Sequence, residues 1–465
     1  MMKHDSEEFR KLGQEVVEWM ADYFAAPERY RVKPVMKPGD LIDRLPAAGP
    51  LDAEPMEKAL ADFYELVLPA VVHWNHPRFL TYFGCTASVP GVLGEMLVSV
   101  LNTNGFNWVA SPAVAELEQV ALQWLRQWMN INDDFFGIIY DTASTSTLHA
   151  IAAARELADP NCRRKGNSPG FIVYASDQAH SSVDKAVLTL GLGLDNLRKI
   201  ESDELFSLRP ELLEKAIMAD LDAGLRPFCI VATIGSTSST SSDPVGAIAD
   251  IAKKYNLWLH VDSAYAGVTA ILPEYRYLFE RINDVDSLVT NPHKWMFVPV
   301  DTSVFYTRHP EVLRRAFTYN LEILTSSEDT RAVNLMDYGF QLGRRFRAVK
   351  LWFVMRYFGL HGIQKILRGQ MALTKDLEAM VRADGRFEVM APVTFSVVCF
   401  RLKASEAMNR KLLEAVNNSG EALISQTTLR GEFTLRIAVG NMATGPEDIE
   451  AVWQLIQRLA GELGG

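Results

Sequence analysis

Cysteine is scarce in this chain, and its scarcity excludes a fold held together by disulfides. The sequence has 4 cysteines in 465 residues, at positions 85, 162, 229 and 399. They show none of the paired CxxC spacing that is typical of zinc or redox sites. Four scattered thiols cannot staple a chain of this length, so we expect free thiols in a reducing, cytoplasmic compartment.

Long apolar runs and an excess of positive charge are also missing. No uninterrupted apolar run approaches the ~18 residues that a membrane span needs, and the first ten residues are polar and acidic, unlike a secretory leader. The formal net charge is −10, which argues against a nucleic-acid binder. The one dense basic run, at 344–347, precedes apolar residues at helical spacing and is interpreted as a helix start. We therefore expect neither a membrane nor a nucleic acid among the partners.

Several common ligand-binding motifs are absent as well. The sequence has no Walker A or HExxH pattern, and Gly191-Leu192-Gly193 lacks the third glycine of a dinucleotide fingerprint. The pair of histidines in His73-Trp74-Asn75-His76 has no further ligand cluster. We interpret these residues as structural or pocket-lining, and we expect no metal site.

What the sequence does contain, from about residue 90 to 350, is an alternation of strand and helix patterns. Short runs rich in β-branched residues occur at 171–174, 228–233, 257–261 and 285–289. Helical stretches occur among them at 112–129, 147–157 and 245–255. This alternation predicts an α/β fold with a large, mostly parallel sheet that is covered by helices on both faces.

The chain length favours two or three domains. Residues 1–85 form a helical segment, with helical patterns at 6–25 and 60–68 around a proline-punctuated stretch, but without a core of their own. Residues 86–350 form the predicted large domain. Residues 351–465 combine long helices, shorter strands and a closing helix, which predicts a small α+β domain.

Lys294 and Asp262 are the most informative pair of residues. Each follows an apolar run that reads as a buried strand. Desolvation lets a lysine at such a place lose its proton, and a neutral amine is what an imine-forming enzyme needs. An aspartate on a neighbouring strand end suits a pyridinium nitrogen, so the pair points to pyridoxal phosphate (PLP). The alternatives are a surface lysine and a structural salt bridge.

Two hydroxyl-rich loops could supply an anion site. The run 141–147, with Thr142, Ala143 and Ser144, follows an apolar stretch and precedes a helical pattern, where backbone N–H groups attract phosphate. The run 235–240, with Thr237, follows the strand at 228–233. The alternatives are a Ser/Thr helix cap and a plain strand-to-helix loop.

His180 follows the strand at 171–174, where ligands sit at the carboxyl ends of strands in doubly wound sheets. It could stack on an aromatic ring or move a proton. A structural role is the alternative.

These pieces together resemble the PLP-dependent group II amino-acid decarboxylases, in particular the aromatic-L-amino-acid decarboxylases. The resemblance extends over nearly the whole chain. Its motifs are His73-Trp74, Gly105-Phe106-Asn107-Trp108, Thr142-Ala143-Ser144, His180-Ser181-Ser182-Val183, His260-Val261-Asp262, Asn291-Pro292-His293-Lys294-Trp295 and Leu342-Gly343-Arg344-Arg345-Phe346-Arg347.

The resemblance implies fold type I of the PLP enzymes and a homodimer with active sites at the interface. It implies that Lys294 forms the aldimine with PLP, that Asp262 pairs with the ring nitrogen, and that Ala264 and His180 sandwich the ring, with Thr237 near it. It places Ala143, Ser144, Asn291 and His293 around the phosphate. Its substrate pocket would include Trp74, Phe83, Gly84, Cys85, Asn104 and Phe106.

The implied activity is decarboxylation of an L-amino acid, most plausibly aromatic, to the amine and CO₂. Three positions depart from the family pattern. Leu335 stands where many members carry a tyrosine that reprotonates the substrate, and phenylalanine there is associated with aldehyde synthases. Gly84-Cys85 replaces Pro-Thr or Pro-Ser, so the glycine could make room for a bulky side chain. Asn104 replaces an apolar residue and could meet a polar tip.

An aromatic aldehyde synthase on the same scaffold therefore stays open as an alternative. A non-catalytic PLP-binding protein is a further alternative of a different class, and an aminotransferase is another. The polar stretch 319–335 is interpreted as a mobile lid or as a plain surface loop.

Overall fold

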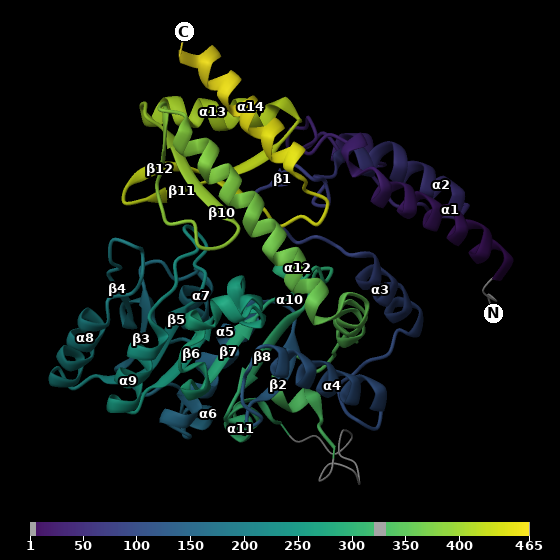
Figure 1. Cartoon of the computed structure of the whole chain (residues 1–465). Helices are drawn as coiled ribbons and strands as arrows, with labels where there is room; N and C mark the ends of the chain where they lie inside the picture. The colour runs from purple at the N-terminus through teal and green to yellow at the C-terminus, as the bar shows by residue number, and fades with distance from the viewer. Residues whose placement is uncertain (1–5, 320–331, 465) are drawn as a thin grey trace. The chain divides into compact units, whose positions relative to one another are not determined.

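The computed structural model describes residues 6–319 and 332–464 (Figure 1). Contacts divide the chain into two compact units. The first contains Met1–Gly84, Asp376–Glu388 and Phe400–Gly465, and the second contains Cys85–Lys375 and Val389–Cys399. The predicted boundaries at 85/86 and 350/351 stay a prediction, because contact grouping does not test which parts fold by themselves.

A seven-stranded sheet forms the centre of the second unit. Its order is β2-β8-β7-β6-β5-β3-β4, and only β8 runs antiparallel to both of its neighbours. The strands are β2 (Phe136–Tyr140), β3 (Phe171–Ser176), β4 (Leu197–Ile200), β5 (Arg226–Thr233), β6 (Trp258–Asp262), β7 (Ser287–Thr290) and β8 (Ser303–Thr307). Strands β3, β6, β7 and β8 are buried at every residue, which requires cover on both faces. The mostly parallel sheet is therefore confirmed.

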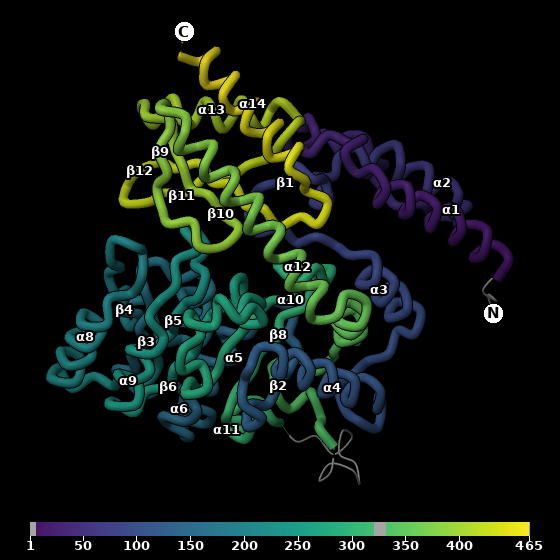
Figure 2. Tube along the Cα trace, in the orientation of Figure 1, coloured from purple at the N-terminus to yellow at the C-terminus, as the bar shows by residue number. Residues whose placement is uncertain are grey.

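Helices of the second unit pack on this sheet (Figures 1 and 2). Helix α5 (Ala143–Ala158) contacts β5 to β8, whereas α8 (Pro210–Asp222) and α9 (Val245–Tyr255) contact β4 to β6. The remaining α-helices of the second unit are α3 (Val89–Leu101), α4 (Pro112–Trp128), α6 (Cys162–Lys165), α7 (Ser182–Thr189), α10 (Pro292–Trp295), α11 (Pro310–Phe317) and the start of α12 (Ala348–Ala383). Helix α12 has a kink at Gly359, whose φ of 62° suits glycine.

The first unit is built around most of a five-stranded sheet of order β1-β11-β12-β10-β9. Its two-residue strand β1 (Phe79–Leu80) pairs in parallel with β11 (Leu423–Leu429). The other strands are β9 (Phe387–Val389), β10 (Val397–Leu402) and β12 (Glu432–Ala438), and the helices are α1 (Ser6–Ala25), α2 (Met56–Asp62), α13 (Glu406–Ser419) and α14 (Pro446–Gly464). The N-terminal segment, up to Gly84, and the C-terminal segment, from Phe400, thus contribute strands to one sheet.

Two further findings bear on function. In the part of the chain that is described, no helix is long and apolar enough to cross a membrane. All four cysteines lie in that part, and none of them forms a disulfide there.

Candidate functional site

The carboxyl ends of four neighbouring strands form the candidate site. In the sheet order β7-β6-β5-β3, these strands are parallel, so their carboxyl ends meet at one edge. Asp262 ends β6, Asn291 follows β7, Thr233 ends β5 and Asp177 follows β3. The segments after these ends carry Lys294, Thr237 and His180. The sheet thereby brings the predicted cofactor residues to one edge.

Asp262 is buried, with 6% of its surface exposed. Its Oδ1 accepts a hydrogen bond from the backbone N–H of Ala264, at 3.0 Å. Its own backbone carbonyl accepts from Ile234 N–H, at 3.0 Å. The carboxylate is therefore held at a fixed place, as a partner for a cationic ring nitrogen must be.

Lys294 lies on α10, a four-residue turn that directly follows β7. Its backbone N–H donates to Asn291 C=O at 2.9 Å, and Asn291 N–H donates to Ala264 C=O at 3.0 Å. These two bonds join the turn that carries the lysine to the segment after Asp262. The predicted lysine and aspartate are thus anchored to the same short stretch of backbone.

His180 lies within electrostatic reach of both residues. Its pKa is lowered, first by desolvation and further by Lys294, while Asp262 acts in the opposite direction. Its Nδ1 accepts from Ser182 N–H at 3.1 Å, so the neutral ring carries its proton on Nε2. The predicted sandwich of a ring between His180 and Ala264 stays a prediction.

Asn291 and His293 supply a buried donor for an anion. Burial lowers the pKa of His293 to about 4, so its ring is neutral. Because its Nδ1 accepts from Thr302 N–H at 2.8 Å, its proton is on Nε2, which lies 3.3 Å from the Asn291 amide. The amide oxygen of Asn291 is the atom that can accept this proton. The opposite amide atom of Asn291, placed as Oδ1, is buried and has no partner among the described residues. With the amide turned over so that its oxygen accepts from His293 Nε2, this atom becomes the NH₂ group, which suits a phosphate oxygen.

The N-terminus of α5 provides further donors. Thr142 holds the N-cap position, but its side chain makes no capping bond; its hydroxyl lies 3.3 Å from Asp141 Oδ1. Thr142 and Ser144 are exposed, whereas Ala143 is buried in a cluster with Ala264 and Val289. This cluster joins the start of the 16-residue helix to the segment after Asp262, so the helix N-terminus and the aspartate share one site.

Cys85, which we predict to line the substrate pocket, belongs to the second unit and lies within electrostatic reach of Lys294. Burial raises the pKa of its thiol to about 11, with Lys294 acting in the opposite direction. The thiol is therefore neutral at physiological pH. Thr237 is exposed on the loop after β5.

Asn104, Phe106 and Leu335 form a second group. Asn104 Oδ1 accepts from Arg344 N–H at 2.9 Å, and Phe106 C=O accepts from Met336 N–H at 2.9 Å. Leu335 begins a short 3-10 turn and is 2% exposed. One side of the Asn104 amide is thus committed to backbone, which limits the polar contact predicted for it. Most of the predicted lid, residues 320–331, lies outside the described residues.

Trp74, Phe83 and Gly84 belong to the first unit. Trp74 stacks on Tyr82, with ring centroids 5.7 Å apart, and Arg436 Cζ lies 4.7 Å from the centroid of the Phe83 ring. A Cβ added at Gly84 would lie 2.9 Å from the backbone carbon of Gly440. The room that we predicted at this glycine is filled by a second backbone.

His73 and His76 both make contacts within the first unit. The ring of His73 stacks on Tyr30 at 4.5 Å and bonds to the hydroxyl of Tyr23 at 3.0 Å. His76 Nδ1 accepts from Arg78 N–H at 2.9 Å. Among the residues with described positions, no group of three or more histidine, cysteine or acidic side chains could hold a metal ion.

These groups fit pyridoxal phosphate. Lys294 supplies the amine and Asp262 the buried carboxylate, and the cluster of Ala143, Ala264 and Val289 supplies small apolar side chains near them. Asn291 and the N-terminus of α5 supply donors for a phosphate, and the partnerless amide atom of Asn291 is the observation that points to a ligand. The sequence had not indicated Thr302, which fixes the ring of His293; a threonine after a surface turn carries no recognisable signal.

Comparison with known proteins agrees with this chemistry. The model of the pyridoxal-dependent decarboxylase conserved domain matches residues 38–403. The chain is 38% identical to tyrosine decarboxylase 4 of Petroselinum crispum, over 99% of this chain and 94% of that protein. It is 37% identical to phenylacetaldehyde synthase of a Rosa hybrid cultivar, over 97% and 94% respectively.

A similar solved structure is that of Oryza sativa TDC with PLP and tryptamine. The TM-score is 0.96 and the sequence identity 35%, and the match covers 100% of both chains. The predicted fold class is confirmed by this likeness, and the predicted family resemblance by the domain match.

Proposed function

Because this chain belongs to the family of pyridoxal-dependent decarboxylases, we propose that it converts an aromatic L-amino acid to the corresponding amine and CO₂. The observation that carries the proposal is the position of Lys294 and Asp262 at the ends of the adjacent strands β7 and β6, in segments joined by the bond from Asn291 N–H to Ala264 C=O and within the domain match over 38–403. Named relatives such as tyrosine decarboxylase 4 support the aromatic substrate class.

Bound pyridoxal phosphate supplies an electron sink for the bond between Cα and the carboxylate. Lys294 would hold the cofactor through its Nζ and exchange this bond for the substrate amine. Asp262 would keep a proton on the ring nitrogen, because its buried charge favours a cation beside it. Asn291 and the N-terminus of α5 would hold the phosphate.

His180 is the residue best placed to serve beside the reacting groups. Its neutral ring carries a proton on Nε2 and lies within electrostatic reach of Lys294 and Asp262. We assign it a stacking or proton-holding role. Cys85, with its neutral thiol, is proposed to line the substrate pocket together with Asn104 and Phe106 of the same unit.

The test is a product balance on purified protein loaded with PLP. We would incubate it with L-Phe, L-Tyr, L-Trp, L-Dopa, L-His, L-Met and L-Glu and quantify CO₂, amine, aldehyde and peroxide together. We expect amine equal to CO₂ for one or more aromatic substrates, without peroxide. CO₂ from none of the aromatic amino acids would contradict the proposed substrate class.

A second candidate function is an aromatic aldehyde synthase, which decarboxylates and oxidatively deaminates. Two observations favour it: Leu335 in place of the proton-donating tyrosine, and 37% identity to a phenylacetaldehyde synthase. Molecular oxygen and water would then be consumed, and aldehyde, ammonia, hydrogen peroxide and CO₂ would be formed. Peroxide equal to CO₂ in the same assay would identify this function.

The role of Leu335 is tested by Leu335→Tyr with Leu335→Phe as the matched control. The two variants add a ring of similar size at this buried position and differ in the hydroxyl. If the hydroxyl donates the proton to Cα, any peroxide made by the wild type falls in the tyrosine variant and persists in the phenylalanine variant. The same peroxide yield in both variants would contradict this role.

The remaining alternative is a PLP-binding protein without catalysis. The presence of both Lys294 and Asp262 at neighbouring strand ends argues against it, since binding alone does not require both. Bound cofactor with a visible absorbance band, but without turnover of any substrate, would favour it. Keto-acid product in the same assay would indicate an aminotransferase.

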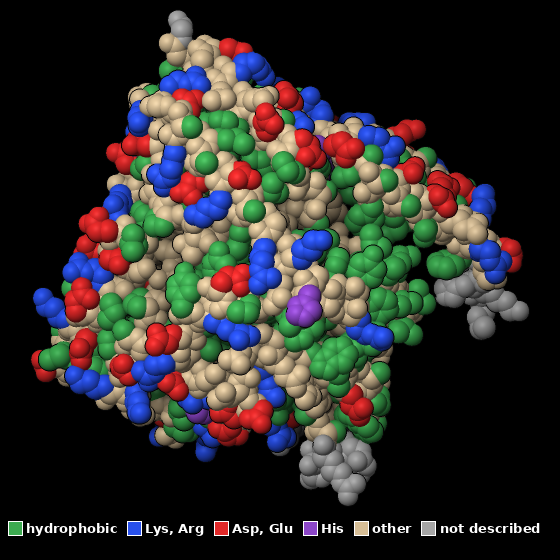
Figure 3. All heavy atoms as spheres, viewed as in Figure 1, with side chains coloured by type: hydrophobic (Ala, Val, Ile, Leu, Met, Phe, Trp, Pro, Cys, Tyr) green, Lys and Arg blue, Asp and Glu red, His purple; other side chains and the backbone are tan. Residues whose placement is uncertain are grey.

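We also propose that the chain forms a homodimer through α3. Six apolar side chains of this helix are between 38% and 73% exposed, at the helical spacing 89, 93, 96, 97, 100 and 101. Figure 3 shows hydrophobic side chains gathered where this helix lies. Apolar patches of this kind mark protein interfaces, and a second copy of the chain is the occupant that the resemblance implies.

The dimer is tested by the mass in solution of Leu97→Glu, with Met218→Glu on α8 as the control. Both side chains are about half exposed, at 50% and 51%. We expect a dimer for the wild type and for the control, and a monomer for Leu97→Glu. A wild-type monomer would overturn the proposal. A cytoplasmic location is likewise a proposal, supported by the four scattered cysteines.

A further inference from the structure

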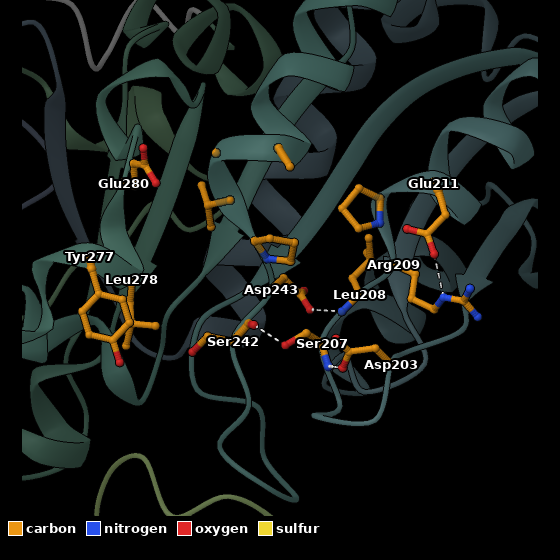
Figure 4. Close-up of a pocket in the computed structure, with 15 residues that line it drawn as sticks. Asp203, Ser207, Leu208, Arg209, Glu211, Ser242, Asp243, Tyr277, Leu278 and Glu280 are labelled. Carbon is orange, nitrogen blue, oxygen red and sulfur yellow. Dashed lines mark hydrogen bonds and ion pairs between the residues drawn. The ribbon is translucent and has the colours of Figure 1, made fainter.

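Asp243 is a buried carboxylate that the proposed mechanism does not use. It follows the loop after β5 and is 5% exposed. Its Oδ2 accepts from Thr233 N–H at 2.7 Å, and its Oδ1 accepts from Leu208 N–H at 2.8 Å. Figure 4 shows the side chain directed at Leu208. One carboxylate thus joins the end of β5 to Leu208, which lies 35 residues before Asp243 in the sequence.

The loop between Thr233 and Asp243 is closed at its base. Asp243 N–H donates to Thr233 C=O at 2.8 Å, and Gly235 and Ser236 N–H both donate to Ser241 C=O at 2.9 Å. Ser236 Oγ lies 2.7 Å from Ser241 Oγ. Thr237, the loop residue that we predict near the cofactor, therefore lies within a loop whose two ends are held by Asp243.

The same end of β5 borders Asp262. Thr233 is the register partner of Asp262 in the parallel pair of β5 and β6, and Ile234 N–H donates to Asp262 C=O. At Gly235, an added Cβ would lie 2.5 Å from Ala266 Cβ, so the loop packs closely against the segment after Asp262. A shift of the loop would thus move both Thr237 and the backbone beside Asp262.

Building on the proposed function, we propose that Asp243 is a positioning residue of the cofactor site. Its carboxylate fixes the end of β5 and the loop 234–242, and through them the backbone of Asp262 and Thr237. The residue does not touch the reacting atoms. Its effect is to hold the ring-nitrogen partner and the loop in place before the cofactor arrives, which lowers the ordering cost of binding.

The charge of Asp243 matters for this role. Two N–H groups point at its two oxygens, and an ionised carboxylate accepts from both. Burial raises the pKa of Asp243 to about 7, and Asp177 and Asp203 act in the same direction, while the two N–H groups lower it. At pH 8 the carboxylate is therefore ionised and both bonds are made.

A surface cavity of about 570 Å³ lies beside Asp243 (Figure 4). Its other charged lining residues are Asp203, Arg209, Glu211 and Glu280. Of these, Arg209 and Glu211 are paired with each other at 2.7 Å. Asp243 thus borders a cavity lined by polar and charged side chains. An asparagine, which is nearly the same size as aspartate, fits at this position.

The experiment compares PLP affinity in Asp243→Asn and Asp286→Asn at pH 8. Asp286 is the matched control, because its Oδ2 accepts from Leu259 N–H at 2.7 Å near the start of β6, at the end of that strand away from Asp262. In Asp243→Asn the amide NH₂ group faces a backbone N–H, so one bond to a charged acceptor is lost. We expect PLP binding to weaken about tenfold, the equivalent of one such bond, and the control to bind as the wild type does.

Binding is measured on the apoprotein by the change in protein fluorescence and by the visible absorbance of the bound cofactor. Equal PLP affinity in Asp243→Asn and the wild type would overturn the proposal. An equal loss in the control would show a general effect of disturbed strands and would overturn it as well. Because the readout is binding, it stays informative even when the wild type decarboxylates none of the substrates tested.

A second variant covers the case in which Asp243→Asn does not fold. Asp243→Glu keeps the charge but moves the carboxylate by one methylene. We expect its PLP affinity to be several-fold weaker than that of the wild type and of Asp286→Asn, and its unfolding temperature without PLP to stay near that of Asp286→Asn. Wild-type affinity in Asp243→Glu would contradict a role that depends on the position of the carboxylate.

Discussion

The backbone bond from Asn291 N–H to Ala264 C=O, 3.0 Å long, sets the relation of Lys294 to Asp262. The lysine lies on a short turn after β7, and the aspartate ends β6. Two strand ends that are paired in register can hold an amine and a carboxylate at a fixed separation, which a flexible loop could not do. The two groups that we propose for the reaction are thus positioned by the sheet itself.

We expect Lys294→Ala to remove the visible absorbance of lysine-bound PLP and to lower turnover by roughly 100-fold to 10,000-fold. The amine that exchanges with the substrate is then missing, while Asp262 and the phosphate donors remain. Lys254→Ala is the control, since Lys254 pairs with Glu214 at the surface, at 2.6 Å. Unchanged absorbance and turnover in Lys294→Ala would contradict the assigned role.

Single residues differed in how well the sequence revealed them. Lys294 and Asp262 were recognisable because each follows an apolar strand pattern. Asp243 was not, since a lone aspartate before a proline reads as a turn residue, and its bond to Leu208 spans 35 residues. Long-range hydrogen bonds of this kind leave no local pattern.

At the scale of elements, the spacing of apolar residues predicted the ends of helices and strands well where that spacing is regular. The predicted helices at 6–25 and 245–255 agree with α1 and α9 to the residue, and the strand at 228–233 lies within β5. Strand β8 was not predicted, because its five residues, Ser303 to Thr307, are too few for a clear strand pattern. Helix α3 was missed because Pro90 and two glycines within it read as breakers.

The close approach of Gly84 to Gly440 makes a prediction at this scale. A Cβ at Gly84 meets backbone, which cannot move as a side-chain tip can. We expect Gly84→Ala to lower the free energy of unfolding by about 1–3 kcal/mol, measured by urea denaturation.

Gly13→Ala is the matched control for this substitution. Gly13 lies inside α1 with nothing within 4 Å of an added Cβ. Alanine there should raise the free energy of unfolding by roughly 0.5–1 kcal/mol, because it lowers the backbone entropy cost of the helix. A loss of stability in both variants, or in neither, would refute the steric explanation.

At the scale of the whole molecule, four buried histidines couple stability to pH. Burial lowers the pKa of His76, His260 and His293 to about 4 and that of His149 to about 3. The ordinary value is 6.5. Between pH 6.5 and about 4, the unfolded chain therefore binds protons that the folded chain does not bind.

The sign follows from this difference in bound protons. Stability is fully present above pH 6.5 and is lost as the pH falls toward 4, since the unfolded state gains the protons. We expect the free energy of unfolding to fall between pH 7 and pH 4, and His149→Gln to make this fall less steep. The slopes are obtained from urea denaturation at several pH values, and equal slopes for the variant and the wild type would contradict the assignment.

The division into two units was the part of the architecture that the sequence revealed least. The pattern suggested an N-terminal segment without a core, but it did not indicate that residues 1–84 group with residues 400–465. The reason is that strand β1 has only two residues, too few for any period to be seen.

Strand β1 has a consequence for the order of events during synthesis. Phe79 and Leu80 pair with Leu423 and Ile424, which the ribosome adds more than 340 residues later. At the 5–20 residues per second typical of translation, this is a wait of roughly 20–70 seconds. During it the two apolar residues lack their sheet neighbour, so the first unit is completed only when the nascent chain is nearly finished.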